Sequence, residues 1–216
     1  MDVAKVKRIA MFIIGLFVMT LGIAVSTKAD IGTTPISSIP FVLCLSTGAD
    51  LYLTTLLFNL MLIGIQILVL GKSFKLLSLL QLPTALIFSL FTKMTVDMVE
   101  DWSPSSYLEC WLFVIAAVVI LGIGVALVVN SRTTMVPGEG VVLALSIRTK
   151  IPFSRMKIFF DVSNILIAAI ISLIAFGGLE GVREGTVFAA IFVGVVVRYS
   201  TIVIKRLFPD PENEIR

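Results

Sequence analysis

The sequence contains no histidine and only two cysteines, and these absences restrict the chemistry available to the protein. Histidine is the commonest metal ligand, the commonest base at neutral pH and a member of most nucleophilic triads. Cys44 and Cys110 are too few and too scattered for a disulfide framework or a thiolate metal site. No paired-carboxylate motif takes their place. We therefore expect no metal, no cofactor and no catalytic residue, and we do not expect an enzyme.

Charged residues are also scarce, at 14% of the 216 residues, whereas hydrophobic residues make up 58%. With a mean hydropathy of +1.08, the chain cannot cover its apolar surface in water, so we place it in a lipid bilayer. The net charge of +3 is small and comes from loops beside apolar stretches. It indicates orientation in a membrane rather than binding of nucleic acid. We expect a single all-α polytopic membrane domain over residues 1–216.

Six long apolar stretches can each cross a hydrocarbon core of about 30 Å at about 1.5 Å per residue, the third only with its flanks. They are Ile9–Val25, Leu51–Leu70, Leu77–Phe91, Trp111–Val129, Ile158–Phe176 and Val187–Ile204. The first follows basic residues, as in a signal peptide. It is long and belongs to the repeat described below, so we expect it to be retained.

Two shorter apolar stretches, Pro35–Leu45 and Pro137–Ile147, have the length of re-entrant or broken half-helices rather than full crossings. Basic residues accumulate on the cytoplasmic side of a membrane. Compared with eight full crossings, six crossings plus two re-entrant segments add three basic residues to the cytoplasmic side and remove one. The three are Lys72, Lys75 and Arg132, and the one is Lys93. We therefore predict six crossings, with both termini in the cytoplasm.

The second half of the sequence repeats the first at a fixed offset, since Pro35 and Pro137 are 102 positions apart. The same shift pairs Gly22 with Gly124, Ala24 with Ala126, Phe58 with Phe160 and Thr84 with Thr186. The repeats cover about residues 9–100 and 111–204. Each contains three crossings, so the second enters the membrane from the opposite face, and the sequence predicts two inverted repeats. Transporters and channels are often built in this way, with the solute site between the repeats.

The tips of the two half-helices carry the first candidate binding residues, which are Thr33, Thr34, Ser37, Ser38, Gly138 and Glu139. Each half-helix starts at a proline, whose missing N–H costs nothing at that position. Free N–H groups with partial positive charge then meet near the midplane. Polar groups at this depth need protein or a water-filled cavity beside them, which predicts a solute pocket. The alternative is ordinary capping, in which Thr34 and Ser37 satisfy their own helix end.

Polar side chains within the apolar stretches form the second group of candidates. Asn59, Asp161 and Asn164 are candidates for substrate binding, and Glu139, Asp161 and Lys157 for coupling or gating. Ionisable groups inside a membrane are costly and face a partner or a cavity. Glu139 stands where the first repeat has Ser37, and either a protonation switch, a cation ligand or a salt bridge with Arg132 fits it. Lys157 and Asp161 are four residues apart, so a structural ion pair and a coupling site both stay open.

Arg183 and Glu184 precede the last apolar stretch and are the remaining candidates for gating. The alternative is an ion pair at the level of the lipid headgroups. Gly185 and Thr186 follow them, at the places that Pro83 and Thr84 hold in the first repeat. This segment therefore permits a close approach or a break just before each final crossing.

Several short motifs occur in a fixed order: Leu21-Gly22-Ile23-Ala24, Ile31-Gly32-Thr33-Thr34-Pro35, Val136-Pro137-Gly138-Glu139-Gly140, Lys157-Ile158-Phe159-Phe160-Asp161 and Arg183-Glu184-Gly185-Thr186. In order and spacing they resemble the bacterial YczE/YyaS/YitT family of small integral membrane proteins. Pro35-Ile36-Ser37 departs from that family's usual Gly-x-x-Pro-Trp-Asp pattern, so no acidic role is carried over to this tip. The resemblance implies a protein of the bacterial cytoplasmic (inner) membrane, in a family often suspected of transport. It implies no substrate.

Taken together, these features predict a secondary transporter of a small polar or anionic metabolite, coupled to protons or sodium, with its site between the two tips. A passive channel and a membrane-embedded helper protein for a partner are the alternatives. The expected partners are the solute and the lipid bilayer, without nucleic acid. Phe12, Phe17, Phe188 and Phe192 face either lipid or the second subunit of a homodimer.

Overall fold

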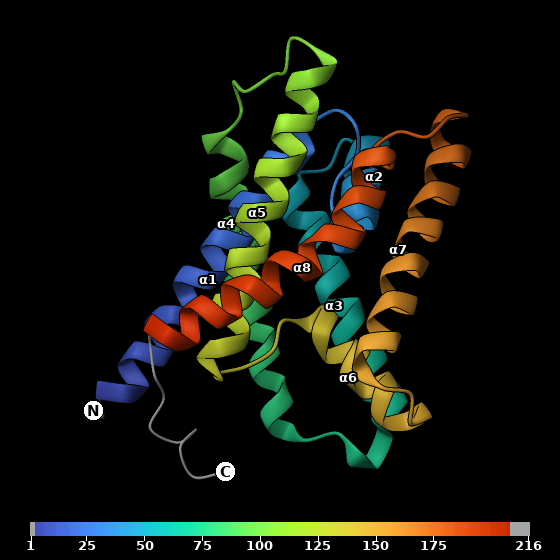
Figure 1. Cartoon of the computed structure of the whole chain (residues 1–216). Coiled ribbons are helices and arrows are strands. Elements are labelled where there is room, and N and C mark those ends of the chain that lie inside the picture. The colour runs from blue at the N-terminus through green and yellow to red at the C-terminus, as the bar shows by residue number, and fades with distance from the viewer. Residues whose placement is uncertain (1–2, 208–216) are drawn as a thin grey trace.

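The computed structural model describes residues 3–207, and within that range the chain is helical without strands (Figure 1). Six helices of this part are long and apolar enough to cross a membrane. They are α1 (Val3–Lys28), α3 (Leu51–Leu70), α4 (Gln81–Met98), α5 (Tyr107–Ser131), α7 (Phe153–Phe176) and α8 (Glu184–Leu207). All six predicted crossings are confirmed as helices of this length, so the protein is a polytopic helical membrane protein.

Short helices occupy the two places predicted for half-helices. The first is the 3-10 turn η1 (Pro35–Ser37) followed by α2 (Ser38–Thr47), and the second is α6 (Pro137–Thr149). At about 1.5 Å per residue, 13 residues of α-helix span far less than a hydrocarbon core. Further 3-10 turns, η2 (Gly71–Ser73) and η3 (Leu76–Leu80), connect α3 to α4. The third crossing gains the length that it needs from η3 and from the extension of α4 to Met98.

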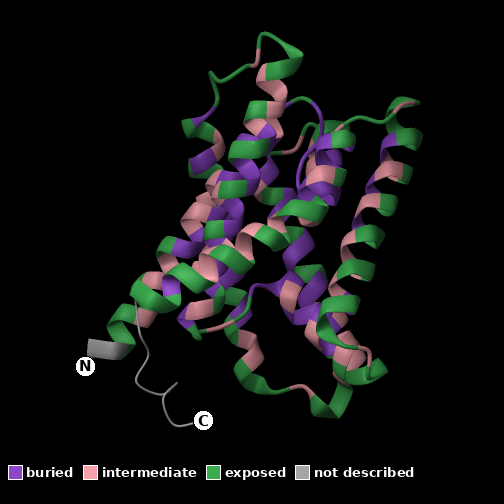
Figure 2. Ribbon diagram, viewed as in Figure 1, coloured by how far each residue is buried: buried purple, intermediate pink, exposed green. Residues whose placement is uncertain are grey.

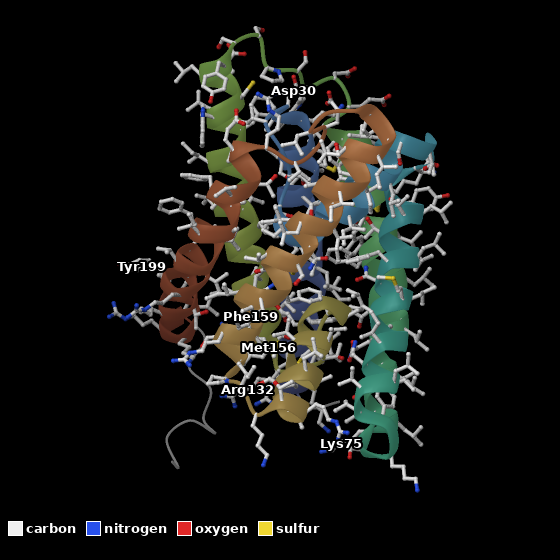
Figure 3. The ribbon with its side chains drawn as sticks, turned by 90° about the vertical axis from the view of Figure 1, so that its right-hand side faces the viewer. Asp30, Lys75, Arg132, Met156, Phe159 and Tyr199 are labelled. Atoms are coloured by element: carbon white, nitrogen blue, oxygen red, sulfur yellow. The ribbon has the colours of Figure 1, made fainter. Side chains whose placement is uncertain are left out.

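The start of α1 and the end of α8 lie at the same end of the bundle (Figure 1). We call this the terminal end and the other the opposite end. Asp30, in the loop before η1, lies at the opposite end, whereas Lys75 and Arg132 lie toward the terminal end (Figure 3). The loops that lead into η1 and into α6 therefore start from opposite ends of the bundle.

The centre of the bundle is the antiparallel pair α1 and α5, which touch at glycines. A Cβ atom added to Gly22 would stand 2.6 Å from the backbone nitrogen of Leu121. One added to Gly124 would stand 2.5 Å from the backbone nitrogen of Met19. Only glycine permits such close contact between two backbones in a membrane. These two contacts map onto each other under the shift of 102 residues.

The backbone also repeats at this offset. Equivalent positions include the helix starts Leu51 and Phe153, the helix starts Pro35 and Pro137, the left-handed residues Asp30 (φ 58°) and Arg132 (φ 52°), and the left-handed residues Gly48 (φ 71°) and Lys150 (φ 60°). A left-handed conformation in non-glycine residues is uncommon and mostly needs a local reason, such as the end of a helix. The sequence repeat is therefore accompanied by a repeat of local structure.

Burial is concentrated on α1, α5, the tip of η1 and the inner faces of α3 and α4, whereas α7 and α8 expose most of their surface (Figure 2). The prediction that Phe12 faces lipid or a second subunit is wrong, because α1 is central and Phe12 is only 4% exposed. Phe17 is half-buried and meets Phe91 edge-on at 5.5 Å between ring centroids. Phe188 and Phe192 stack on each other at 4.3 Å on α8.

Candidate functional site

The two half-helices begin in the interior of the bundle, each at a proline that occupies its first turn. No side chain caps the start of η1, α2 or α6. The first N–H groups of a helix have no acceptor within the helix itself. The N–H groups of Gly138 and Glu139, at the second and third positions of α6, are of this kind. Uncapped donors at this depth make the tips candidates for a polar ligand.

At the first tip the hydroxyl groups bond to one another and to neighbouring carbonyls. Thr33 Oγ1 lies 2.7 Å from Ser26 Oγ on α1, and the Thr34 hydroxyl donates to Ser37 Oγ at 3.0 Å. The Ser38 hydroxyl donates to the carbonyl of Pro35 at 2.7 Å. Thr34 and Ser37 therefore do not satisfy their own helix end, as the capping alternative required. All four hydroxyl-bearing residues of the predicted tip are buried.

The two tips meet. A Cβ atom on Gly138 would collide with the side chain of Ile36, and it would stand 4.0 Å from a methyl of Leu62. The predicted convergence of η1 and α6 is therefore present, and the point of contact is apolar. Polar groups lie around this contact rather than at it. Because Gly138 has no side chain, the backbone of α6 can lie directly against the side chain of Ile36.

Each tip is held by the second crossing of the other half of the chain. The hydroxyl of Ser38, at the start of α2, also lies 3.3 Å from the carbonyl of Asn164 on α7. On the other side, the amide of Gln66 on α3 donates to the carbonyl of Pro137 at 3.2 Å. Asn164 is 3% exposed and donates to its own helix, at the carbonyl of Phe160. The tips thus connect the two halves of the chain.

The charged candidates gather between α6 and α7. Lys157 Nζ and Asp161 Oδ1 are 2.8 Å apart, which is the predicted ion pair. The charges of Lys157 and Asp161 also act on Glu139, in the first turn of α6. The three side chains are partly exposed, with Lys157 at 33% and Asp161 at 19%. They form a cluster of two carboxylates and one ammonium beside the second tip.

The buried polar side chains of the described residues are hydroxyls and amides, and none of them is charged. Most come from the first half of the chain. Asn59, a predicted binding residue, is 7% exposed on the inner face of α3. On α4 the hydroxyl of Ser89 is buried and has no hydrogen-bond partner in the described part of the chain. The interior therefore offers neutral hydrogen-bonding groups, whereas the charged cluster stands at its margin.

Arg183 and Glu184 lie away from the tips, at the start of α8. They form an exposed ion pair, with Arg183 Nη2 3.3 Å from Glu184 Oε1. The guanidinium of Arg183 also donates to the carbonyl of Asp30 at 3.2 Å, and the hydroxyl of Tyr107 donates to Glu184 at 3.3 Å. The structure does not bring this pair together with Glu139, Lys157 and Asp161.

Gln66 and Gln81 hold the second tip and were not among the sequence candidates. Their side-chain amides donate to each other at 2.9 and 3.0 Å, and both are buried. A Cβ atom on Gly140 would stand 2.5 Å from Gln66 Oε1 and 2.7 Å from Gln81 Oε1. The signal in the sequence was Gln66 itself, which with Asn59 is one of two amides in the apolar stretch Leu51–Leu70, since a polar residue in a crossing needs a partner.

The sequence model of a family of unknown function, DUF6198, matches residues 6–201. The chain belongs to DUF6198. The matched range includes both tips, the charged cluster and all but the end of α8. The resemblance to the YczE/YyaS/YitT family stays a prediction. No curated protein and no solved structure matches the chain.

Proposed function

We propose that this member of DUF6198 is a secondary transporter built from two inverted repeats, with a binding site for a small polar solute around the tips of η1 and α6. The observation that carries the proposal is the meeting of two uncapped, proline-started half-helices, with Ile36 against Gly138. Half-helices whose N-termini point at the substrate near the midplane are a recurrent device of such transporters.

The inverted arrangement is supported by the contact between α1 and α5. These helices are equivalent under the shift of 102 residues, yet they run antiparallel, and Gly22 and Gly124 make equivalent contacts. A rotation that exchanges two antiparallel helices has its axis across them. In a membrane such an axis lies in the plane of the bilayer, which is the symmetry of inverted-topology repeats.

A carrier is favoured over the passive channel by the same contact between the tips. A continuous pore needs an open path at the midplane, whereas Ile36 packs on Gly138 there. A carrier must not have such an open path, because its site has to be closed on at least one side of the membrane at all times. Glu139 and Asp161 are the groups that we propose to bind the coupling proton or sodium ion, with Lys157 as their internal counter-ion.

The neutral interior bears on the class of solute. Buried hydroxyls and amides suit a neutral or zwitterionic solute, and the uncapped N–H groups of the tips suit a single carboxylate. A solute with several negative charges would lack a fully buried cation in the described residues. We therefore place small polar metabolites with at most one anionic group first among the substrates.

The test is a thermal-unfolding screen of the detergent-purified protein against polyols, amino acids, small monocarboxylates and sulfonates, with and without sodium and at two pH values. A solute at 100 times its dissociation constant adds roughly 2.7 kcal/mol of stability. We expect a shift with at least one solute, lost in Thr34→Val and kept in the matched variant Thr47→Val, whose hydroxyl is exposed at the end of α2.

Uptake of that solute into proteoliposomes then separates the candidate functions. Accumulation that depends on a proton or sodium gradient and is lost in Glu139→Gln supports the coupled carrier. Flux of the same solute that ignores both gradients supports the channel. No shift and no uptake with any solute, together with a stoichiometric protein that co-purifies, would replace the proposal by the helper function.

A further inference from the structure

The two loops that lead into the tips are equivalent in sequence position but differ in exposure. Ile31, Gly32, Thr33 and Thr34 are all buried, and Thr33 is 1% exposed. Their equivalents 102 residues later are Thr133, Thr134, Met135 and Val136. Of these, Thr133 is exposed, Thr134 is half-buried and Met135 is 44% exposed, whereas Val136, next to the tip, is buried. The loop before η1 is therefore buried, whereas the loop before α6 is partly exposed (Figure 2).

A short ladder of main-chain hydrogen bonds closes the first loop. The N–H of Gly185 donates to the carbonyl of Ile31 at 2.8 Å, and the N–H of Thr33 donates to the carbonyl of Gly181 at 3.3 Å. Gly32 (φ 103°) packs against the hydroxyl of Thr186. The loop before η1 is thus paired with the segment before α8, which comes from the other half of the chain.

The equivalent hydrogen bonds cannot both form in the loop before α6, at the terminal end. The residue equivalent to Gly185 is Pro83, which has no backbone N–H to donate. The second tip is held by side chains instead, through the amides of Gln66 and Gln81. Main-chain hydrogen bonds therefore hold the first tip, whereas side-chain amides hold the second. The difference follows from the sequence, which has Gly185 in one repeat and Pro83 in the other.

We infer that residues 31–33 and 181–185 form a gate at the opposite end, that this gate is closed in the resting protein, and that solute reaches the tips from the terminal end. The passage of solute through this gate rests on the proposed transport function. The closure of the gate does not, because it can be measured as the accessibility of residues to a reagent. The exposed guanidinium of Arg183 donates to the carbonyl of Asp30, the residue just before the first loop, and Asp30 lies at the opposite end of the bundle (Figure 3).

Opening this gate requires the segment before α8 to move away from the first tip. That segment is tied back at its other side, since the hydroxyl of Ser172 on α7 donates to the carbonyls of Gly178 and Glu180 at 2.8 and 3.0 Å. Ser172 also accepts the N–H of Glu180 at 2.6 Å. We therefore expect residues 178–185 to move together with the end of α7, and not to lose their structure independently of it.

The experiment uses single cysteines in protein that carries Cys44→Ala and Cys110→Ala, in membrane vesicles of known orientation, with a membrane-impermeant maleimide as probe. Thr33→Cys and Met135→Cys occupy equivalent positions. Lys205→Cys and Ser103→Cys, both at exposed positions, report the terminal and opposite sides. We expect Met135→Cys to react from the terminal side, and Thr33→Cys to react about tenfold more slowly from either side, because labelling of a closed site requires local opening.

A gate variant tests the ladder. The Cβ of Gly185→Ala would stand 2.7 Å from the carbonyl oxygen of Ile31, so this change should break the bond and expose Thr33→Cys to reagent from the opposite side. Gly178→Ala, whose Cβ meets nothing within 4 Å, is the matched control and should change nothing. If Gly185→Ala does not fold, Thr186→Val replaces it, since it removes only the hydroxyl that accepts the N–H of Arg183.

Reaction of Thr33→Cys from the opposite side as fast as that of Met135→Cys from the terminal side would overturn the inference. So would a folded gate variant that leaves Thr33→Cys unreactive. The expected labelling in a protein that shows no thermal shift and no uptake with any solute, and that co-purifies with a stoichiometric partner, would retain the gate and reject transport. Solute uptake with an open first loop would retain transport and reject this gate.

Discussion

The paired amides of Gln66 and Gln81 show what a single residue contributes in this interior. Each amide satisfies the other, and Gln66 also donates to the carbonyl of Pro137 at the second tip. A buried polar group that loses its partner costs more than the bond itself was worth, because the remaining group stays desolvated. The pair therefore fixes the position of α6 against α3.

Gln66→Leu alone should lower the free energy of unfolding by roughly 1–3 kcal/mol, because the Gln81 amide and the Pro137 carbonyl are left unpaired. The double variant Gln66→Leu, Gln81→Leu should cost less than the sum of the two single variants. Thermal or denaturant unfolding in detergent measures all three. Additive costs would mean that the two amides act independently.

The ion pair of Lys157 and Asp161 acts at the same scale, beside Glu139. Lys157→Met leaves two carboxylates near each other without a cation, so it should cost about 1 kcal/mol, a modest value because the pair is partly exposed. Asp161→Asn leaves Lys157 beside Glu139 and should cost less. The comparison of their unfolding midpoints in detergent checks this order, and equal midpoints would show that Glu139 is not part of the cluster.

At the scale of helices, the contact of α1 with α5 depends on close approach between backbones. Gly22→Leu and Gly124→Leu should each destabilise the protein by about 1–3 kcal/mol or more, because the added side chain meets the backbone of Leu121 or Met19. The two effects should be similar in size, since the contacts are equivalent.

Gly64→Ala on α3 is the matched control for these two variants. A Cβ atom at Gly64 would meet nothing within 4 Å. Replacement of glycine by alanine within a helix is favourable by about 1 kcal/mol when no clash occurs. Its unfolding midpoint should therefore stay constant or rise, and a fall as large as that of Gly22→Leu would argue against a specific contact between α1 and α5.

At the scale of the whole molecule, six crossings and eight crossings place the same loops on different sides of the membrane. We expect Lys75→Cys to react with an impermeant maleimide from the side of the termini and Ser103→Cys from the other side. Both positions are exposed. Lys205→Cys gives the reference for the terminal side. The reverse assignment of Lys75 and Ser103 would mean that the short helices cross the membrane.

The positions of the helices could be predicted from the sequence because each depends on local properties of the chain. Long apolar stretches became α1, α3, α4, α5, α7 and α8, and the prolines at 35 and 137 start the short helices. The ion pair of Lys157 with Asp161 follows from spacing along one helix. The repeat at 102 residues also predicted which elements are equivalent. These features require no knowledge of which helices are neighbours.

Only the tertiary structure decided how the equivalent elements differ. The meeting of Ile36 with Gly138, the amides of Gln66 and Gln81 at the second tip, and the burial of Phe12 depend on contacts between distant segments. In a chain that is apolar nearly throughout, hydropathy does not distinguish lipid from protein as the neighbour of a side chain, because both are equally apolar. Packing and hydrogen bonds make that choice, and they are properties of the folded molecule.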